Sequence, residues 1–267
     1  MGKKIKIQTR SLGSEPDPCP DLGEVVQWLR TRKGVGADLT GYRLYSTLVP
    51  QVSASVEIPC TGGNFYQSRI LETIRGIKEM TIIGEPGLEM AFIERDVCDI
   101  VAGFGRHWFA MPALCSLGIR DGYYGDDEEF SGVMLQVYRR LMREMRDFGV
   151  TGHILIVESP DEEELAVLAG RKTMFFYRYP TREDLESLLE YQRTIAVPGD
   201  ALEVALSLKE EYTIDRLLLI DPVPGDLEIA LSHWDPDSLS VAGYCDVCGE
   251  GYWNTLVEGA SNVILPD

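Results

Sequence analysis

Apolar residues recur in short blocks along the C-terminal two thirds of the chain. The blocks are nearly continuous instead of alternating, which is typical of parallel strands covered on both faces. Between most of them lie segments with helical periodicity; in 182–193, for example, Leu185, Leu188 and Leu189 share one helical face. We therefore predict strands at 81–85, 99–105, 153–159, 173–179, 194–198, 216–221, 238–244 and 262–266.

Proline and acidic residues follow several of these predicted strands, as in SPDEEE (159–164), YPTRED (179–184) and VPGD (197–200 and again 223–226). Proline suits the first helical turn because its missing N–H would be unpaired there. Aspartate and glutamate in that turn cap free amides and complement the helix dipole. This chemistry predicts βα units with right-handed crossovers, and it explains the repeated VPGD without a duplication.

The fold class that we expect is α/β, with a mainly parallel, doubly wound, Rossmann-like sheet and helices on both faces. A compact (β/α)8-like barrel is the alternative. The predicted strands span only 81–266, which is short against the roughly 250 residues of a usual barrel. The long interval 106–152 also favours an open sheet; it contains a helix-like piece at 108–117, an acidic loop at 121–130 and one long amphipathic helix.

The N-terminal segment has a different pattern. A strand at 5–9 precedes a proline-rich loop and a helix beginning near Asp21, and the runs 43–49 and 52–58 suggest a hairpin. We predict that residues 1–60 form a small α+β cap or dimerisation element, which makes a homodimer an expectation. Residues 61–267 then form the βα-repeat domain with a ligand site at its strand ends.

Composition narrows the class of protein. The 267 residues include 43 acidic and 25 basic ones, for a net charge of −18. Binding to nucleic acid requires clustered lysine and arginine, so no nucleic-acid partner is expected. Apolar runs are shorter than the ~20 residues of a membrane helix, and the N-terminus lacks the apolar region of a signal peptide. We expect a cytoplasmic protein with no membrane contact and a small-molecule ligand.

Parallel α/β folds bind ligands at the carboxyl ends of their strands, which selects candidate residues without any motif. Glu158 and Asp221 follow predicted strands and are candidates for acid/base catalysis. His107 is a third catalytic candidate, since it could activate a cysteine thiol at a neighbouring strand end. Arg178 is a candidate for holding an anionic group of a ligand.

A glycine turn follows the predicted strand 99–105. Gly103 and Gly105 begin a nucleotide-binding pattern, but its third glycine would fall at Trp108, so the dinucleotide fingerprint fails. A weaker prediction remains: Gly103, Gly105 and Arg106 cradle S-adenosylmethionine or a mononucleotide, together with Arg178.

Cys245 and Cys248 form the single Cys-x-x-Cys pair among six cysteines. A structural zinc site normally needs two such pairs, so it is disfavoured. Three alternatives stay open: a catalytic divalent-metal site completed by His107, Asp221 or Glu158, a redox dithiol, or a structural pair.

Together these residues predict a small-molecule enzyme, of the group-transferase kind, that uses a nucleotide-derived cofactor such as S-adenosylmethionine. The alternative is a non-catalytic metal- or redox-binding protein built on Cys245 and Cys248.

Overall fold

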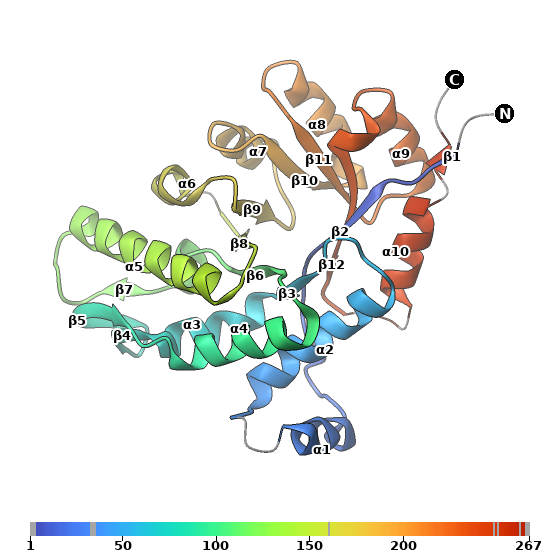
Figure 1. The fold of residues 1–267 in the computed structure, drawn as a ribbon. Helices are drawn as coiled ribbons and strands as arrows, with labels where there is room; N and C mark the ends of the chain where they lie inside the picture. Colours follow the sequence, from blue (N-terminus) through green and yellow to red (C-terminus); the bar gives the residue numbers. More distant parts are fainter. Residues whose placement is uncertain are drawn as a thin grey trace.

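Eight parallel strands form the centre of the molecule in the computed structural model, which describes residues 4–32, 36–159, 161–247, 249, 251–261 and 263–264 (Figure 1). Most of these strands are rich in apolar or β-branched residues that pack on both faces. The strands are β2 (Gln8–Ser14), β3 (Cys60–Gly62), β6 (Trp108–Pro112), β8 (Gly152–Val157), β9 (Thr173–Tyr177), β10 (Thr194–Pro198), β11 (Arg216–Ile220) and β12 (Leu239–Cys245).

The eight strands close into a barrel. Backbone pairing gives two runs in the orders β10-β11-β12-β2 and β3-β6-β8-β9. The amide of Ser11 donates to the carbonyl of Ile58 (2.9 Å), and the amide of Ile58 donates to the carbonyl of Thr9 (3.0 Å), which joins β2 to the approach of β3. The side chain of Gln192 joins β9 to β10: it accepts from the Phe175 amide (2.9 Å) and donates to the carbonyls of Phe175 (3.1 Å) and Thr194 (2.6 Å).

The prediction of an α/β fold with parallel strands flanked by helices is confirmed, and of its two closures the chain adopts the barrel. The shortness of the predicted strand array favours the open sheet, which the structure does not form. Two features let a barrel fit: the first strands come from the N-terminal segment, and four consecutive outer helices have only seven or eight residues each. These are α6 (Glu162–Leu168), α7 (Arg182–Leu189), α8 (Leu202–Lys209) and α9 (Pro224–Leu231).

The predicted turn chemistry begins these short helices. Asp161 caps α6 by accepting from the Glu164 amide, and Thr181 forms a capping box with Asp184 at α7. On the other side of the barrel lie the longer helices α2 (Leu39–Ser53), α4 (Ala91–Phe104) and α5 (Asp127–Phe148), while α10 (Tyr252–Ser261) follows β12. The long amphipathic helix expected within 106–152 is α5, which buries Met134, Leu135, Tyr138, Leu141, Met142 and Met145.

Smaller elements complete the chain. Helix α1 (Leu22–Thr31), capped by Asp21 as expected, projects beyond α2, and α3 (Gln67–Thr73) leads into the hairpin of β4 (Ile74–Lys78) and β5 (Thr81–Leu88) beside α5 (Figure 1). β7 (Arg120–Asp121) pairs with β5, and β1 (Lys4–Ile5) pairs antiparallel with β13 (Val263–Ile264). The 3-10 turns are η1 (Asn64–Tyr66), η2 (Cys115–Leu117), η3 (Gly199–Ala201) and η4 (Pro236–Ser238).

Three predictions of local structure were wrong. Residues 99–105 end the helix α4, because Ile93, Val97 and Ile100 recur at helical spacing and are buried on one face. Residues 108–112, expected in a helix, form barrel strand β6, and the hairpin expected at 43–58 is largely the helix α2. The strand predicted at 81–85 exists, but it belongs to the β4–β5 hairpin outside the barrel.

The domain boundary predicted near residue 60 does not separate two structural units. Strand β2 pairs with β12 over Gln8–Ser14 and contacts the approach of β3, so the predicted cap supplies the first strand of the barrel. The interior holds a compact cluster from alternate positions of these strands: Leu12, Cys60, Ala110, Ile154, Ile156, Met174, Phe176, Ala196, Leu218, Ile220, Ala242 and Tyr244.

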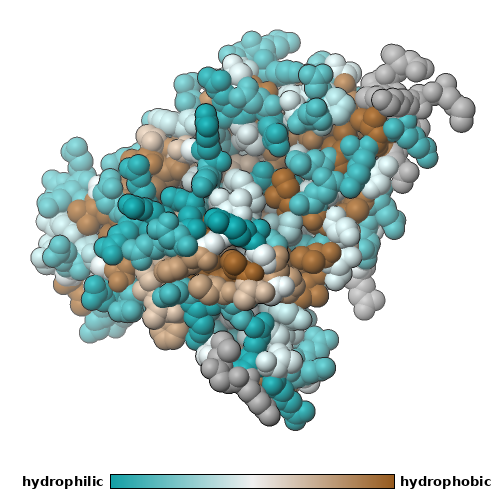
Figure 2. Space-filling view, viewed as in Figure 1, coloured by the Kyte–Doolittle hydropathy of each residue, from teal (hydrophilic) through white to brown (hydrophobic). Residues whose placement is uncertain are grey.

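The surface in Figure 2 is mostly hydrophilic, with hydrophobic residues gathered in a band across its middle. Among the described residues, every helix is too short or too polar to traverse a lipid bilayer.

Candidate functional site

Two pockets adjoin at the carboxyl ends of the barrel strands. The first, which we call the central pocket, has a volume of about 570 Å³ and lies over β9 to β12. The second, the side pocket, has about 580 Å³ and lies between the residues after β2, helices α1 and α2, and the start of α10. Asp246 lines both, so they form neighbouring parts of one region. The central pocket is lined by Phe176, Arg178, Tyr179, Pro198, Gly199, Asp200, Ile220, Asp221, Val223, Asp226, Tyr244 and Asp246.

Arg178, the first residue after β9, is held between an acid and two aromatic rings. Its Nη2 donates to Oδ2 of Asp246, and its guanidinium carbon lies 5.1 Å from the centroid of the Tyr244 ring and 5.3 Å from that of Tyr179. Contact with aromatic faces favours a cation and restricts its orientation. Arg178 therefore presents a positioned cation in a pocket whose other ionisable residues are mainly acidic.

Glu15 connects this cluster to the first barrel strand. Its carboxylate accepts from the Tyr244 hydroxyl and from the amides of Asn64 (2.7 Å) and Phe65 (3.2 Å). The Glu15 amide donates to the carbonyl of Cys245 (2.7 Å). Burial and the neighbouring Glu15 carboxylate raise the pKa of Tyr244, so its hydroxyl stays a donor at neutral pH. Glu15 thus fixes the ends of β2, β3 and β12 relative to one another.

Asp221 follows β11 in an unusual backbone conformation, with φ at +46°. This left-handed region is strained for residues other than glycine, although aspartate and asparagine tolerate it better than most. Its amide donates to the Ala242 carbonyl (3.0 Å), and its Oδ1 accepts from the Tyr252 hydroxyl (2.6 Å). Partial desolvation raises the pKa of Asp221, while the Tyr252 hydrogen bond opposes that shift. The carboxyl group of Asp221 therefore has a higher pKa than an ordinary aspartate.

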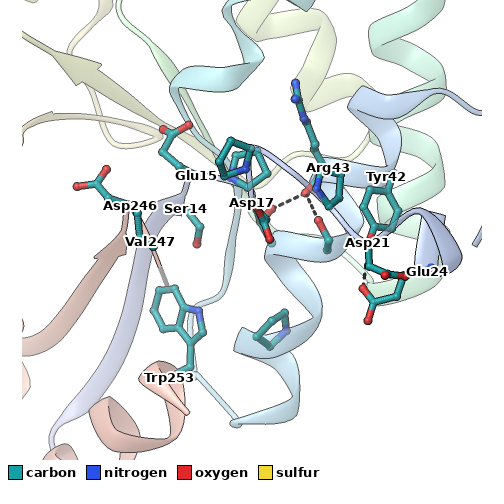
Figure 3. Close-up of a pocket in the computed structure, with 16 residues that line it drawn as sticks. Ser14, Glu15, Asp17, Asp21, Glu24, Tyr42, Arg43, Asp246, Val247 and Trp253 are labelled. Atoms are coloured by element: carbon teal, nitrogen blue, oxygen red, sulfur yellow. Dashed lines mark hydrogen bonds between the residues drawn. The ribbon is translucent and has the colours of Figure 1, made fainter. Parts of the chain in front are cut away.

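The side pocket is strongly acidic. Figure 3 shows Asp246, Val247 and Ser14 above the Trp253 ring, with Asp21, Glu24 and Tyr42 across the pocket from them. Some of these acids cap local structure: Asp17 accepts from the Cys19 amide, and Asp21 from the Glu24 amide. Arg43 is the single basic residue in its described lining, so the pocket suits a ligand that carries a positive charge.

The structure brings together part of the predicted site. Arg178 and Asp221 both line the central pocket, and Cys245 ends the adjacent β12. Glu158 also follows a strand, β8, but it is exposed and lies outside the described linings of both pockets. The rule that ligand residues gather at strand carboxyl ends therefore found two members of the central pocket.

The predicted cofactor turn and His107 lie at the opposite end of the barrel. Gly103 belongs to the last turn of α4, Gly105 caps it at a φ of +82°, and Arg106 and His107 lead into the amino end of β6. The prediction that these residues line the ligand site was wrong, because residues 99–105 end a helix and not a strand. Burial lowers the pKa of His107, whose carbonyl accepts from the Thr151 amide (2.8 Å).

Cys245 is buried and disulfide-bonded, whereas Cys19, Cys60, Cys98 and Cys115 are free. Cys248 lies outside the described residues. Among the described residues no group of three or more His, Cys, Asp or Glu side chains is arranged to hold a metal ion. A thiolate ligand requires a free sulfur, so the oxidised Cys245 does not fit a metal site.

Sequence reasoning missed several side chains that shape the site, namely Glu15, Asp246 and Tyr252. Glu15 lies in the predicted proline-rich loop, but β2 runs on to Ser14, beyond the strand predicted at 5–9, and so places Glu15 at a strand end. Asp246 stands between the two cysteines of the Cys-x-x-Cys pair, and no sequence pattern marks it as a partner of Arg178. Tyr252 lies on α10 and approaches Asp221 only through the tertiary fold.

No protein-family model matches this chain, and no curated protein matches it in sequence. Solved structures match its fold. One is a B12-independent methionine synthase from Shewanella sp. W3-18-1 in complex with selenomethionine, with a TM-score of 0.64, 14% identity, and coverage of 96% of this chain and 97% of that one. Another is a putative vitamin-B12-independent methionine synthase from Listeria monocytogenes, with a TM-score of 0.63, 12% identity and the same coverage. At these identities the likeness concerns the barrel fold.

Proposed function

We propose that this chain is an enzyme that transfers a small group, in the first instance a methyl group, between small polar molecules in the central pocket. The observation that carries the proposal is the pairing of a positioned cation, Arg178, with a proton-exchanging carboxylate, Asp221, in one pocket at the strand ends. The match over nearly the whole chain to methionine synthase folds supports methyl transfer as the reaction class.

Arg178 has the role of holding an anionic group of the substrate. In the structure it pairs with Asp246, whose side chain is 43% exposed. A substrate carboxylate can replace Asp246 as the partner, because a guanidinium binds carboxylates in a planar, two-pronged geometry. Asp246 is then free to accept a hydrogen bond from a substrate amine. Such a pair of contacts suits an amino acid.

Asp221 has the role of base. An acceptor X–H gives its proton to the Asp221 carboxylate, X forms a bond to the methyl carbon, and the donor–methyl bond breaks with its electron pair remaining on the donor. The raised pKa of Asp221 makes it a better base than an ordinary aspartate. Glu158 is the other sequence candidate for this role, and its exposure outside the pocket makes it the weaker one.

S-adenosylmethionine fits this proposal as a donor class, although the predicted glycine turn lies at the other end of the barrel. The acidic side pocket adjoins the central pocket through Asp246 and complements a positively charged sulfonium. Its lining includes the largely buried aromatic side chains of Tyr42 and Trp253, which add apolar contact for a ligand.

Thermal-shift and calorimetric measurements with S-adenosylmethionine, methionine and homocysteine test the proposal, since a ligand of the folded state raises the melting temperature. We expect at least one to bind wild type and to bind more weakly to Arg178→Met. In an assay of methyl transfer with the ligands that bind, Asp221→Asn should lose about 10²- to 10⁴-fold in kcat, the usual contribution of a general base. Glu158→Gln is the matched control and should retain activity.

Unchanged activity in Asp221→Asn overturns the assigned base, and loss in Glu158→Gln transfers the role to that residue. Failure of all three ligands to bind argues against methyl transfer. The disulfide at Cys245 keeps one alternative open: a redox protein that uses this cysteine without a small-molecule transfer.

A further inference from the structure

A third pocket opens at the amino end of the barrel, opposite the central pocket. It has a volume of about 490 Å³, and we call it the amino-end pocket. Barrel strands supply its floor, and the loops before β9 and β10, with the first residue of β11, supply its rim. Its lining consists of Arg10, Trp108, Gly170, Arg171, Thr173, Met174, Tyr191, Gln192, Arg193, Thr194 and Arg216.

The charge of this lining opposes that of the whole protein. Acidic residues outnumber basic ones by 43 to 25 along the chain, yet the described lining contains four arginines and neither aspartate nor glutamate. Arg193 lies 4.0 Å from Asp215 in a pair whose side chains are largely exposed, so solvent screens that contact. The pocket is therefore a concentrated positive region on an acidic protein.

Arg10 is the most buried of the four arginines. It extends from β2 and is 6% exposed, with its guanidinium carbon 4.2 Å from the centroid of the Trp108 ring. Its Nε and Nη2 are buried, and neither has a hydrogen-bond partner among the described residues. Burial lowers the pKa of Arg10 to about 10 and the nearby Arg216 also lowers it, so the group remains a cation at neutral pH.

Such a group is costly for the protein alone. A buried cation normally has a carboxylate partner or a full set of hydrogen bonds, because desolvation removes its stabilisation by water. The Trp108 ring stabilises Arg10 only in part. A second cation, Arg216, is held nearby by Gln8, whose Oε1 accepts from Arg216 (3.4 Å) and from Ser240 (3.4 Å). The two guanidiniums repel each other unless an anion lies between or beside them.

The position of Trp108 depends on a glycine. A Cβ added at Gly152 would lie 2.9 Å from the Trp108 ring, so a larger residue would displace the ring from its place beneath Arg10. Interior positions of four strands, β2, β6, β8 and β11, therefore determine the shape of the pocket, and Arg171 and Arg193 lie at its rim.

We propose that the amino-end pocket binds a small organic phosphate. Guanidinium groups bind phosphate oxygens in two-pronged pairs, and four of them without acids favour a ligand with more than one negative charge. The volume exceeds that of inorganic phosphate and falls in the range of small-molecule sites, which leaves room for an organic part beside Tyr191 and Met174. This site is independent of the proposed transfer reaction, because it shares no residue with the central or side pocket.

Calorimetric titration of the full chain with inorganic pyrophosphate, at constant ionic strength, tests the proposal. Citrate serves as a carboxylate probe of high charge. We expect pyrophosphate to bind with one-to-one stoichiometry, and Arg193→Gln and Arg216→Gln to weaken it by at least about tenfold each, as for charge-assisted hydrogen bonds. Arg140→Gln, on the exposed face of α5, removes the same charge outside the pocket and should leave the affinity unchanged.

Arg10→Met separates binding from folding. Because it replaces an uncompensated buried cation by an apolar chain of similar length, it should unfold at the same temperature as wild type or higher, and pyrophosphate should no longer raise that temperature. Three results overturn the proposal: pyrophosphate fails to bind, Arg140→Gln weakens binding as much as Arg193→Gln, or citrate binds more tightly than pyrophosphate. A lower melting temperature of Arg10→Met with pyrophosphate binding retained assigns Arg10 to the structure alone and also overturns it.

Discussion

The Tyr252 hydroxyl donates a hydrogen bond of 2.6 Å to Oδ1 of Asp221, which joins the first residue of α10 to the end of β11. This bond stabilises the carboxylate of Asp221, whereas the surrounding protein favours the neutral acid. The chain thus holds one carboxylate between two opposing influences on its pKa. Removing the Tyr252 hydroxyl should therefore raise the pKa of Asp221, because burial then acts unopposed.

Tyr252→Phe should raise the pKa of Asp221, because the substitution removes the hydrogen bond that lowers it. If Asp221 is the base, activity requires its ionised form. The acidic limb of the profile of kcat/KM against pH should then move to higher pH, with little change on the alkaline side. Tyr179→Phe is the matched control, since Tyr179 lines the same pocket and contacts Arg178 instead of Asp221. An acidic limb that stays in place in Tyr252→Phe would contradict the assignment.

Asp221→Asn should stabilise the protein at neutral pH. The folded-state pKa of Asp221 is raised above its unfolded value, so ionisation costs the folded state free energy once the pH exceeds the folded pKa. That cost declines as the pH falls through the folded pKa, and it disappears below the unfolded value of about 3.9. Asparagine tolerates the positive φ and can still accept from Tyr252. Urea unfolding at several pH values should give a stabilisation at neutral pH that vanishes in acid; a pH-independent difference would refute this explanation.

Arg178→Met should raise KM for a carboxylate substrate by about 10- to 100-fold, the usual effect of one charge-assisted hydrogen bond or pair. The value of kcat should change less, because Arg178 binds the substrate instead of exchanging its proton. Arg182→Met is a suitable control: Arg182 pairs with Glu186 on α7 and with Glu211 in the turn after α8, and it does not line the pocket. Equal effects of the two substitutions would indicate a general influence of charge.

The sequence predicted the parallel α/β class because near-continuous apolar strands and proline–acid turns are local signals. It therefore located β8 to β12 and the strand-end residues Arg178 and Asp221. The errors occurred where apolar content and periodicity disagreed: 99–105 is apolar enough for a strand, yet its buried partners Ile93 and Val97 recur at helical spacing. Closure of the barrel depended on contacts between distant segments, such as Ser11 with Ile58, which no local pattern encodes.

The contact between β9 and β10 illustrates the same limit and supports a prediction of stability. Gln192 replaces backbone pairing there with three hydrogen bonds to Phe175 and Thr194. Gln192→Leu should lower the free energy of unfolding by about 2 to 4 kcal/mol, at about 1 kcal/mol per lost bond together with unsatisfied backbone groups. Gln136→Leu, on the exposed face of α5, is the matched control and should change it by less than about 0.5 kcal/mol. Equal stability of the two variants would show that β9 and β10 need no such bridge.

The oxidised state of Cys245 predicts a count of reactive thiols. Six cysteines occur in the sequence; of the five that the structure describes, four are free and Cys245 is in a disulfide, which consumes two thiols. Protein purified and denatured without reductant should therefore react with a thiol reagent at four positions, and at six after reduction. Cys245→Ser should give five reactive thiols before and after reduction, whereas Cys98→Ser, which removes an exposed free thiol, should give three and then five. Six reactive thiols in unreduced wild type, accompanied by bound zinc, would instead support the metal-binding alternative, because a zinc-bound thiolate is released by denaturation and a disulfide is not.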